Sequence, residues 1–237
     1  MPAAPHLDIE IADLSFRYPD GTIALDGIDL AIPPAGRVAL IGPNGAGKST
    51  LMLHFNGLLH GQGTVRILGQ DLTDATLPAI RRQVGLVFQS PDDQLFMPTV
   101  FDEVAYAAVN AGYDEATVGT RVAEALATVA MTQYADKHPI NLSIGQKKRI
   151  AIASVLVTDN RILVLDEPSA GLDPAGRRAL IALLHSFTST LVIATHDLDL
   201  VHRLCSHAVV MKAGAIIRTG LAADILADTA FLTSAGL

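Results

Sequence analysis

Apolar and polar side chains alternate over residues 7–18, and this period of two predicts a half-buried strand. The dipeptide Asp20-Gly21 that follows is a turn signal. Beyond it, a glycine-rich loop at 42–47 separates a short apolar run from a helix predicted at 48–59. Further strands are predicted where short apolar runs are bounded by turn residues, at 28–32, 37–41, 64–68 and 84–88.

The pattern changes between about residues 100 and 158, where alanine is frequent and apolar positions recur at helical spacing. Strand-like runs then return and alternate with helical stretches. This alternation predicts an α/β core with an inserted helical subdomain. We therefore divide a single domain into a core, residues 1–97 and 159–237, and a helical subdomain, residues 98–158. The individual predictions are helices at 100–109, 115–130, 146–157, 177–187 and 197–204, and strands at 162–165, 191–194, 208–211 and 215–219.

Composition is that of a globular protein, and the overall charge gives no electrostatic indication of nucleic-acid binding, although it leaves a local basic patch open. Half of the 237 residues are hydrophobic and the formal net charge is −7, with a pI near 5.5, so we expect no nucleic-acid partner. The single cysteine, Cys205, excludes an intramolecular disulfide and favours a reducing, cytosolic setting. The N-terminus, Met1 to Leu7, lacks the basic and apolar regions of a signal peptide. Because no apolar run approaches the roughly 18 residues of a spanning helix, we expect the chain not to cross a membrane itself.

The strongest chemical signal is the run Gly42-Pro43-Asn44-Gly45-Ala46-Gly47-Lys48-Ser49, which fits G-x-x-x-x-G-K-[ST]. Its glycines let the backbone approach a ligand closely, so that the loop N–H groups point inward. The helix that begins near Lys48 adds the positive end of its dipole. We expect Lys48 to reach the β- and γ-phosphates of a nucleotide, and Ser49 to bind Mg²⁺. The residues expected to bind ATP here are Gly42, Pro43, Asn44, Gly45, Ala46, Gly47, Lys48, Ser49 and Thr50.

Two carboxylates, Asp166 and Glu167, end the apolar run at 162–165. A buried strand places such groups at the carboxyl edge of the sheet, beside the phosphate loop. We expect Asp166 to hold Mg²⁺ through water, and Glu167 to orient and polarise the attacking water. The two roles differ because adjacent residues of a strand point to opposite faces.

The run Leu142-Ser143-Ile144-Gly145-Gln146 precedes a predicted helix. Ser143 and Gln146 have the spacing of a capping box, and a helix N-terminus can receive an anion. The run resembles the L-S-G-G-Q signature of ATP-binding-cassette (ABC) ATPases, with Ile144 in place of the first glycine. In that family the signature binds the γ-phosphate of the ATP held by the other protomer, so two cassettes close head-to-tail over two nucleotides. Because a β-branched side chain lacks the backbone freedom of glycine, we expect Ile144 to slow hydrolysis or to shape the interface while the site still works.

Further positions match the same family in the same order along the chain. Tyr18 resembles the aromatic residue that stacks on adenine. Gln89 resembles the Q-loop glutamine, which senses Mg²⁺ and water, and His196 resembles the switch histidine that contacts the γ-phosphate. Residues 169–173, which end in Asp173, resemble the D-loop that crosses the dimer interface. The resemblance implies catalytic roles for Glu167, His196 and Gln89, and a Mg²⁺ site formed by Ser49, Gln89 and Asp166.

The resemblance also implies a fold, a P-loop NTPase (RecA-like) α/β core with an N-terminal antiparallel β region and an inserted α-helical subdomain.

The segment directly after Gln89 indicates one subgroup of this family. By itself it predicts a turn and a short helix, because Pro91 suits a first helical turn and the two aspartates suit its dipole. It resembles the Q-helix of the ATPases of energy-coupling-factor importers, which take up vitamins or transition metals such as cobalt and nickel. The residues expected to contact a transmembrane coupling subunit, with the carboxylates paired to its basic residues, are Pro91, Asp92, Asp93, Gln94 and Phe96.

These observations predict a peripheral ATPase on the cytoplasmic face of the cell membrane that energises import. Cobalt or nickel is favoured as the cargo, because a complete single cassette can form the homodimer of the metal-type systems. The expected cofactor is Mg²⁺ with ATP, and the expected partners are a second cassette in a homodimer or heterodimer, a transmembrane coupling subunit and a substrate-binding membrane subunit. The alternatives left open are a vitamin importer of the same class, a conventional importer with a periplasmic binding protein, a non-transport ABC ATPase acting on DNA, the ribosome or a cell-division complex, and a nucleotide sensor that barely hydrolyses ATP.

Overall fold

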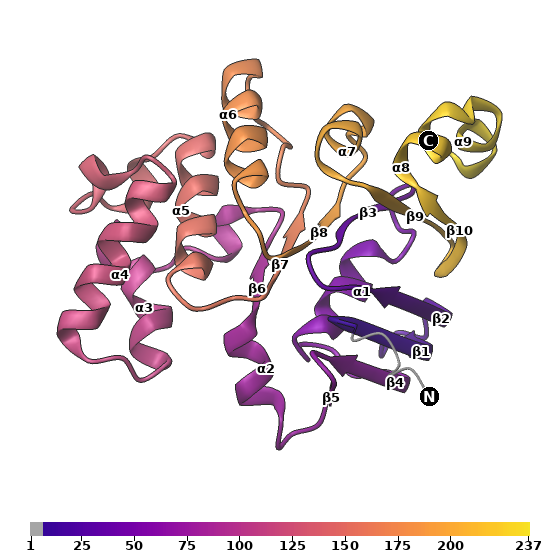
Figure 1. Cartoon of the computed structure of the whole chain (residues 1–237), viewed down its shortest axis with the longest axis horizontal. Helices are drawn as coiled ribbons and strands as arrows, with labels where there is room; N and C mark the ends of the chain where they lie inside the picture. Colours follow the sequence, from indigo (N-terminus) through magenta and orange to yellow (C-terminus); the bar gives the residue numbers. More distant parts are fainter. Residues whose placement is uncertain (1–6) are drawn as a thin grey trace.

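An antiparallel sheet forms one side of the molecule in the computed structural model, which describes residues 7–237 (Figure 1). Its strand order is β2-β1-β4-β5, and the strands are β1 (Ile9–Arg17), β2 (Ile23–Ile32), β4 (Gln62–Ile67) and β5 (Gln70–Asp71). Buried and less buried residues alternate at the start of β1, as its sequence predicts. A bulge near Asp13 then shifts the register, so that Leu14 returns to the core.

A six-stranded, mostly parallel sheet forms the centre of the fold, in the order β10-β9-β3-β8-β7-β6. Its strands are β3 (Arg37–Ile41), β6 (Val84–Val87), β7 (Ile162–Asp166), β8 (Thr190–Ala194), β9 (His207–Lys212) and β10 (Ala215–Leu221). The inner strands are continuous apolar runs because both faces of the sheet are covered. Since β3, β7 and β8 run parallel, the loops that follow them gather at one edge of the sheet.

Helices cover both faces of this sheet, and three of them form an inserted subdomain at one end (Figure 1). The core helices are α1 (Lys48–Phe55), α2 (Leu77–Gln83), α6 (Pro174–His185), α7 (Leu198–Leu204), α8 (Ala222–Ala227) and α9 (Thr229–Ala235). The subdomain contains α3 (Val100–Asn110), α4 (Glu115–Thr128) and α5 (Ile144–Leu156), and short 3₁₀ turns lie at η1 (Pro91–Asp93), η2 (Thr132–Tyr134) and η3 (Pro139–Asn141). Side chains that accept a backbone N–H cap six of these helices, namely Thr99, Asp114, Ser143, Asp173, Asp197 and Asp228.

Two apolar clusters pack against opposite faces of the parallel sheet, because successive residues of a strand point to opposite sides. In β7, Leu163 and Leu165 belong to the first cluster, whereas Ile162 and Val164 belong to the second. The first cluster is continuous from α3, α4 and α5 to α6, α7, α8 and α9, and we call it the shared core. The second cluster lies between the parallel sheet, α1 and the antiparallel sheet.

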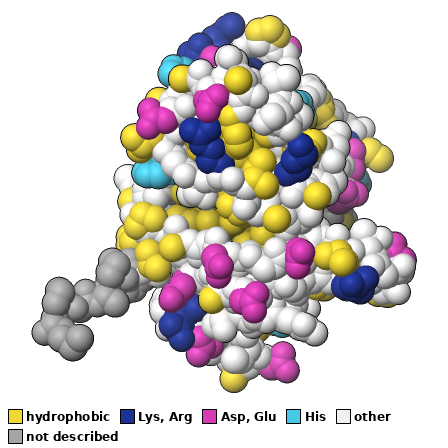
Figure 2. Space-filling view, turned by 90° about the vertical axis from the view of Figure 1, so that its right-hand side faces the viewer, with side chains coloured by type: hydrophobic (Ala, Val, Ile, Leu, Met, Phe, Trp, Pro, Cys, Tyr) yellow, Lys and Arg dark blue, Asp and Glu magenta, His cyan; other side chains and the backbone are white. Residues whose placement is uncertain are grey.

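The face on the side of β10 and the antiparallel sheet carries both acidic and basic side chains around a band of hydrophobic atoms (Figure 2). Between residues 7 and 237, no helix combines the length and the apolar character needed to span a bilayer.

The structure confirms the α/β class, the antiparallel N-terminal sheet and the inserted helices, and it corrects several boundaries. Helix α1 ends at Phe55 instead of residue 59, because the chain turns at Gly57, which has a left-handed φ of 64°. Helix α6 begins at Pro174 instead of residue 177, since proline suits the first helical position. Helix α5 begins at Ile144 instead of residue 146. The elements β5, α2, α8 and α9 have no counterpart among the sequence predictions, because each is too short for a periodic pattern to stand out.

Candidate functional site

The glycine-rich loop between β3 and α1 has the backbone shape that its sequence predicts. Gly47 has a φ of 101°, and a Cβ atom at this position would lie 2.5 Å from the carbonyl oxygen of Ala24. Only glycine fits there without strain. Lys48 Nζ donates hydrogen bonds to the carbonyl oxygens of Gly42, at 2.7 Å, and Pro43, at 3.0 Å. The loop thus holds the ammonium group of Lys48 against its own backbone.

The loop opens into a pocket of about 450 Å³ that gathers residues far apart in the sequence. Burial lowers the pKa of Lys48, and the nearby carboxylates of Glu167 and Asp166 oppose that effect. A pocket that combines a helix N-terminus, an ammonium group and two carboxylates fits a polyphosphate bound with a divalent cation. The predicted site residues that line it are Tyr18, Asn44, Gly45, Ala46, Gly47, Lys48, Ser49, Thr50, Gln89, Asp166, Glu167 and His196.

Glu167 has a left-handed backbone directly beyond β7, with a φ of 42°. Its N–H donates to the carbonyl oxygen of Ala194 at 2.8 Å. Its carboxylate accepts hydrogen bonds from Thr195 Oγ1 at 3.0 Å, from the His196 N–H at 3.0 Å and from His196 Nδ1 at 2.8 Å. Because β7 ends at Asp166, the different directions of the two carboxylates come from this turn and not from strand alternation, which corrects our sequence argument.

Oxygen donors suited to Mg²⁺ meet at the end of β7. Burial raises the pKa of Asp166, and a hydrogen bond with Ser49 acts to lower it. Gln89, in the loop after β6, lines the same pocket. Hydroxyl, carboxylate and amide oxygens are the hard ligands that Mg²⁺ prefers. In the part of the chain that the structure describes, no three His, Cys, Asp or Glu side chains gather as a metal site. Ser49, Gln89 and Asp166 offer only part of a coordination sphere. This suits a cation that is bound together with phosphate oxygens.

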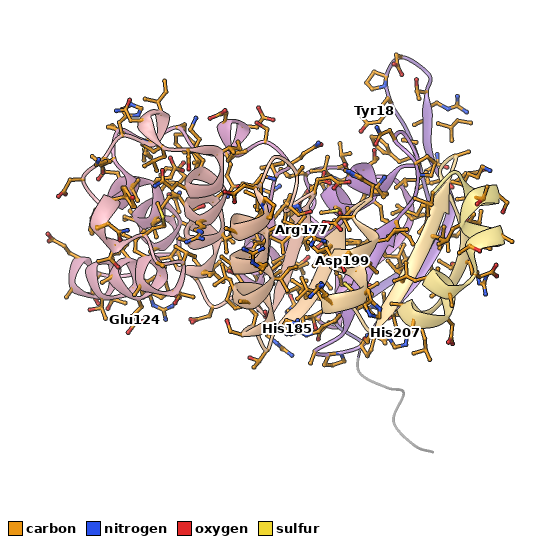
Figure 3. All side chains as sticks on the ribbon, turned by 90° about the horizontal axis from the view of Figure 1, so that it is seen from above. Tyr18, Glu124, Arg177, His185, Asp199 and His207 are labelled. Atoms are coloured by element: carbon orange, nitrogen blue, oxygen red, sulfur yellow. The ribbon has the colours of Figure 1, made fainter. Side chains whose placement is uncertain are left out.

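Tyr18 lies at the edge of the pocket, directly after β1 (Figure 3). Its hydroxyl oxygen is 3.0 Å from Thr50 Oγ1. Its ring packs edge-to-face on Phe16, with ring centroids 5.0 Å apart. These two contacts fix the orientation of the half-buried ring, and the stacking on adenine stays a prediction.

The signature residues lie outside this pocket. Ser143 and Gln146 form the predicted capping box, in which the Gln146 N–H donates to Ser143 Oγ at 3.3 Å and the Ser143 N–H donates to Gln146 Oε1 at 2.9 Å. Ser143, Gly145 and Gln146 line a second hollow of about 530 Å³, together with Asp173 of the D-loop. One chain therefore holds two separate hollows, the geometry expected if the second serves a neighbouring protomer.

Ile144 is the first residue of α5, and its φ is not positive. The backbone freedom of glycine is therefore not needed at this position, which removes our reason for expecting slow hydrolysis. The side chain is 43% exposed and lies beside Gly171 of the D-loop, so its effect on an interface stays a prediction. Leu142, in contrast, is buried in the shared core.

A charged network that the sequence analysis does not identify ties the D-loop to the segment after His196. Arg177 donates to both carboxylate oxygens of Asp197, at 2.7 and 2.6 Å, and to Asp199 Oδ2 at 2.7 Å. Ser169 Oγ donates to Asp197 Oδ2 at 3.0 Å. Figure 3 shows Arg177 and Asp199 close together on the adjacent helices α6 and α7. Burial acts to raise the pKa of Asp197, but the hydrogen bonds, those of Arg177 foremost, outweigh it and lower the pKa to about 2.

Arg177→Met should lower the free energy of unfolding in a pH-dependent way. Because the pKa of Asp197 is about 2 in the folded chain and about 3.9 in an unfolded one, its stabilising contribution is complete above pH 4 or so and is lost as the pH falls toward 2. We expect a loss of about 2 kcal/mol near pH 6 that shrinks below about pH 4, measured by urea unfolding. Arg178→Met is the matched control, since Arg178 is its exposed neighbour on α6. A loss that does not change with pH would contradict this account.

The expected coupling segment forms the turn η1, but one of its residues points inward. Gln94 Oε1 accepts a hydrogen bond from the Phe88 N–H at 3.2 Å. Its Nε2 donates to the carbonyl oxygen of Ala151 at 2.9 Å and to Ser154 Oγ at 3.0 Å. These bonds attach Gln94, directly after η1, to the residue that follows β6 and to α5. The amide of Gln94 is therefore used inside the chain, and contact of this residue with a partner stays a prediction. Pro91 is likewise buried.

The other residues of the segment reach the surface. Asp92 pairs with Lys147 of α5 at 2.6 Å, and Asp93 is exposed. Phe96 is 65% exposed and packs edge-to-face on Tyr106 of α3, with ring centroids 5.2 Å apart. Tyr106 is itself 45% exposed. A pair of aromatic rings open to solvent is typical of a surface that a protein partner covers.

Comparison with known proteins agrees with this geometry. Residues 25–170 match the family described as ABC transporter. The chain is 48% identical, over 98% of its length, to an ABC transporter ATP-binding protein of Geobacter sulfurreducens, of which it covers 94%. It is 45% identical, over 97% of its length, to the energy-coupling factor transporter ATP-binding protein EcfA of Methanocaldococcus jannaschii, of which it covers 84%.

Two solved structures extend the likeness to three dimensions. A CbiO protein from Clostridium perfringens, described as part of the ABC transporter complex CbiONQ, superposes with a TM-score of 0.85 at 37% identity, covering 97% of this chain and 94% of that one. An ATP-binding cassette solved as a dimer in a post-hydrolysis state with ADP and phosphate gives a TM-score of 0.82 at 26% identity, covering 90% of this chain and 98% of that one. Both likenesses extend far beyond the phosphate loop.

Proposed function

The chain belongs to the ABC transporter family as an ATP-hydrolysing subunit, and we propose that it energises import as the ATPase of an energy-coupling-factor transporter. The observation that carries ATP hydrolysis is the pocket that gathers the phosphate loop, Asp166, Glu167 and His196, and the importer class is supported by the relatives. Two relatives that are each 45% identical to this chain carry the energy-coupling-factor name. A structural neighbour at 37% identity belongs to the CbiONQ complex.

Phosphate binding follows from the shape of the loop. The N–H groups at the start of α1 and the ammonium of Lys48 bind the β- and γ-phosphates of ATP. Ser49, Gln89 and Asp166 would supply oxygen ligands for Mg²⁺, which would neutralise phosphate charge when bound with ATP. Because Lys48 Nζ now contacts loop carbonyls, it exchanges these for phosphate oxygens of higher negative charge.

Hydrolysis is assigned to Glu167. Its carboxylate accepts a hydrogen bond from the water that attacks the γ-phosphorus and so polarises that water. In the structure the same carboxylate is bonded to Thr195 and His196. The His196 ring therefore fixes the carboxylate from one side, and it lines the pocket where the γ-phosphate would lie.

A second cassette completes each site in this proposal. The signature residues around Ser143 lie in their own hollow beside Asp173 and do not line the nucleotide pocket of the same chain. Two chains that pair head-to-tail bring the Ser143 end of one α5 to the ATP held by the other. The second cassette is either another copy of this chain or a related one.

The exposed part of the coupling segment is where we place the membrane partner. Asp93 and Phe96 would contact the transmembrane coupling subunit, which itself sits beside a substrate-binding membrane subunit. The chain would then lie peripherally on the cytoplasmic face of the membrane. For the cargo we propose a transition-metal ion, cobalt or nickel, over a vitamin, because one cassette with both Glu167 and His196 can form a homodimer by itself.

Purification of the tagged chain from mildly solubilised membranes of its host tests the transport assignment. We expect it to recover a multispan coupling subunit and a small substrate-binding membrane protein. Phe96→Ser removes an exposed ring and should reduce this recovery about tenfold or more, while soluble ATPase activity stays within about twofold. Ile217→Ser is the matched control, because Ile217 is 43% exposed on β10 and should change neither quantity.

The other outcomes of this purification are equally informative. Recovery of ribosomal or nucleic-acid partners alone contradicts transport and leaves the ATPase assignment standing. The recovered assembly also decides the cargo, since uptake of labelled cobalt or nickel ions supports the metal proposal and uptake of a vitamin supports the alternative.

A further inference from the structure

Lys148 carries a buried ammonium group that reaches from α5 of the helical subdomain to the end of β7. The residue is 6% exposed, and its Nζ donates hydrogen bonds to the carbonyl oxygens of Glu167, at 2.8 Å, and Pro168, at 3.2 Å. Burial lowers the pKa of Lys148, and the carboxylates of Glu167 and Asp166 oppose that effect. A buried ammonium is unfavourable unless its surroundings compensate it, and here two carbonyl dipoles and two carboxylates do so.

Glu167 depends on its surroundings for its backbone conformation. A residue other than glycine is unfavourable at a φ of 42° unless tertiary contacts hold it there. The Glu167 N–H donates to the carbonyl oxygen of Ala194 of β8, and the Glu167 carbonyl oxygen accepts from Lys148 Nζ of α5 at 2.8 Å and from the Ala170 N–H at 3.2 Å. Its two peptide groups are therefore held from different elements. These contacts determine where the carboxylate that meets His196 points.

We propose that Lys148 is a positioning residue for ATP hydrolysis. Its hydrogen bond fixes the position of the Glu167 backbone relative to α5, and this position sets the orientation of the Glu167 carboxylate. This inference rests on the proposed role of Glu167 in hydrolysis. Lys148 does not line the nucleotide pocket of its own chain, and its ammonium is bonded to the backbone of Glu167 and Pro168, so we place its effect on Glu167. It lines the hollow that also contains Ser143, at the start of the same helix.

The expected coupling segment is held by the same helix. Lys147, next to Lys148 on α5, pairs with Asp92 of η1, and the amide of Gln94 donates to two acceptors on α5. Both η1 and Glu167 are therefore attached to the same rigid helix, α5. A displacement of η1 that carries α5 with it reaches Glu167 through Lys148.

Lys148→Met tests this role, because methionine fills a similar volume without a charge or an N–H donor. We expect kcat for ATP hydrolysis to fall about 10- to 100-fold, as for a displaced catalytic group, with Kd for ATP within about threefold. In a chain that already carries Glu167→Gln, the same change should alter the residual rate by less than about twofold, since the carboxylate through which it acts is gone. Lys137→Met, at an exposed lysine of the subdomain, is the control and should alter neither rate.

An equal loss in both backgrounds, or an unchanged kcat for Lys148→Met, overturns the proposal. The backbone amide resonance of His196 gives a readout that needs no turnover, because this N–H donates to the Glu167 carboxylate at 3.0 Å. We expect Lys148→Met to shift it, and an unshifted resonance also overturns the proposal. A wild-type chain that does not hydrolyse ATP refutes the proposed function instead, and the His196 resonance still decides the role of Lys148. Lys148→Leu, which also lacks a charge and an N–H donor, replaces Lys148→Met if that chain does not fold.

Discussion

Glu167→Gln is expected to lower kcat for ATP hydrolysis by about 100- to 10,000-fold, the range that loss of a general base costs. The amide keeps the size of the carboxylate; its oxygen can still accept from His196 and its NH2 group can donate to Thr195 Oγ1, but it cannot take a proton from the attacking water. Kd for ATP should stay within about threefold, because the phosphate contacts come from the loop and Lys48. Single-turnover phosphate release and nucleotide titration measure the two quantities separately.

Glu124→Gln is the matched control for this substitution. Glu124 is exposed on α4, far from the nucleotide pocket (Figure 3), and its change to glutamine should leave kcat as it is. If Glu167→Gln reduces a slow wild-type rate by less than about tenfold, the chain is better described as a nucleotide sensor than as a transport ATPase.

Gly47→Ala should raise Kd for ATP by at least about 100-fold. At a φ of 101° an alanine is strained, and its Cβ would lie 2.5 Å from the Ala24 carbonyl oxygen, inside van der Waals contact. The loop can relieve this clash only by moving away from Ala24, and that movement displaces the N–H groups that face the phosphates. We also expect the free energy of unfolding to fall by about 2–4 kcal/mol. Calorimetric titration with ATP and urea unfolding measure the two effects.

Gly112→Ala separates backbone strain from the clash. Gly112 has a φ of 86°, and a Cβ atom there would meet nothing within 4 Å. It lies between α3 and α4, outside the nucleotide pocket. We expect about 1 kcal/mol of lost stability and unchanged ATP binding. Equal ATP affinities in the two variants would show that the phosphate loop tolerates a side chain at Gly47.

The phosphate loop and the capping box are predictable from sequence because their residues are close together in the chain. The spacing from Gly42 to Ser49 itself defines the loop, and Ser143 and Gln146 bond to each other across one helical turn. The main strands and helices are predictable for the same reason, since a period of two or of 3.6 residues is a local property. The ends of several elements and the short elements β5, α2, α8 and α9 required the structure.

The contacts of Lys148 and Arg177 are not predictable in this way, because each joins elements that meet only when the sheet is assembled. Lys148 is one of several basic residues on its helix, and its burial depends on how α5 packs against the end of β7. Arg177 meets Asp197, 20 residues away, because α6 and α7 are neighbours. For Gln94 the family pattern predicts contact with a partner, whereas in the structure its amide donates to the backbone of α5.

The shared core makes the helical insertion part of one cooperative folding unit. It runs without a break from Val104 in the insertion to Leu163 and Leu165 of β7 and on to Leu232 of α9. Excision of the insertion would expose part of that apolar surface and leave a fragment prone to aggregation, not a smaller ATPase. Thermal unfolding should accordingly occur in one step. A substitution on the buried face of the insertion must therefore match the core that it covers, and we expect exchange of the insertion as an independent module to disrupt folding.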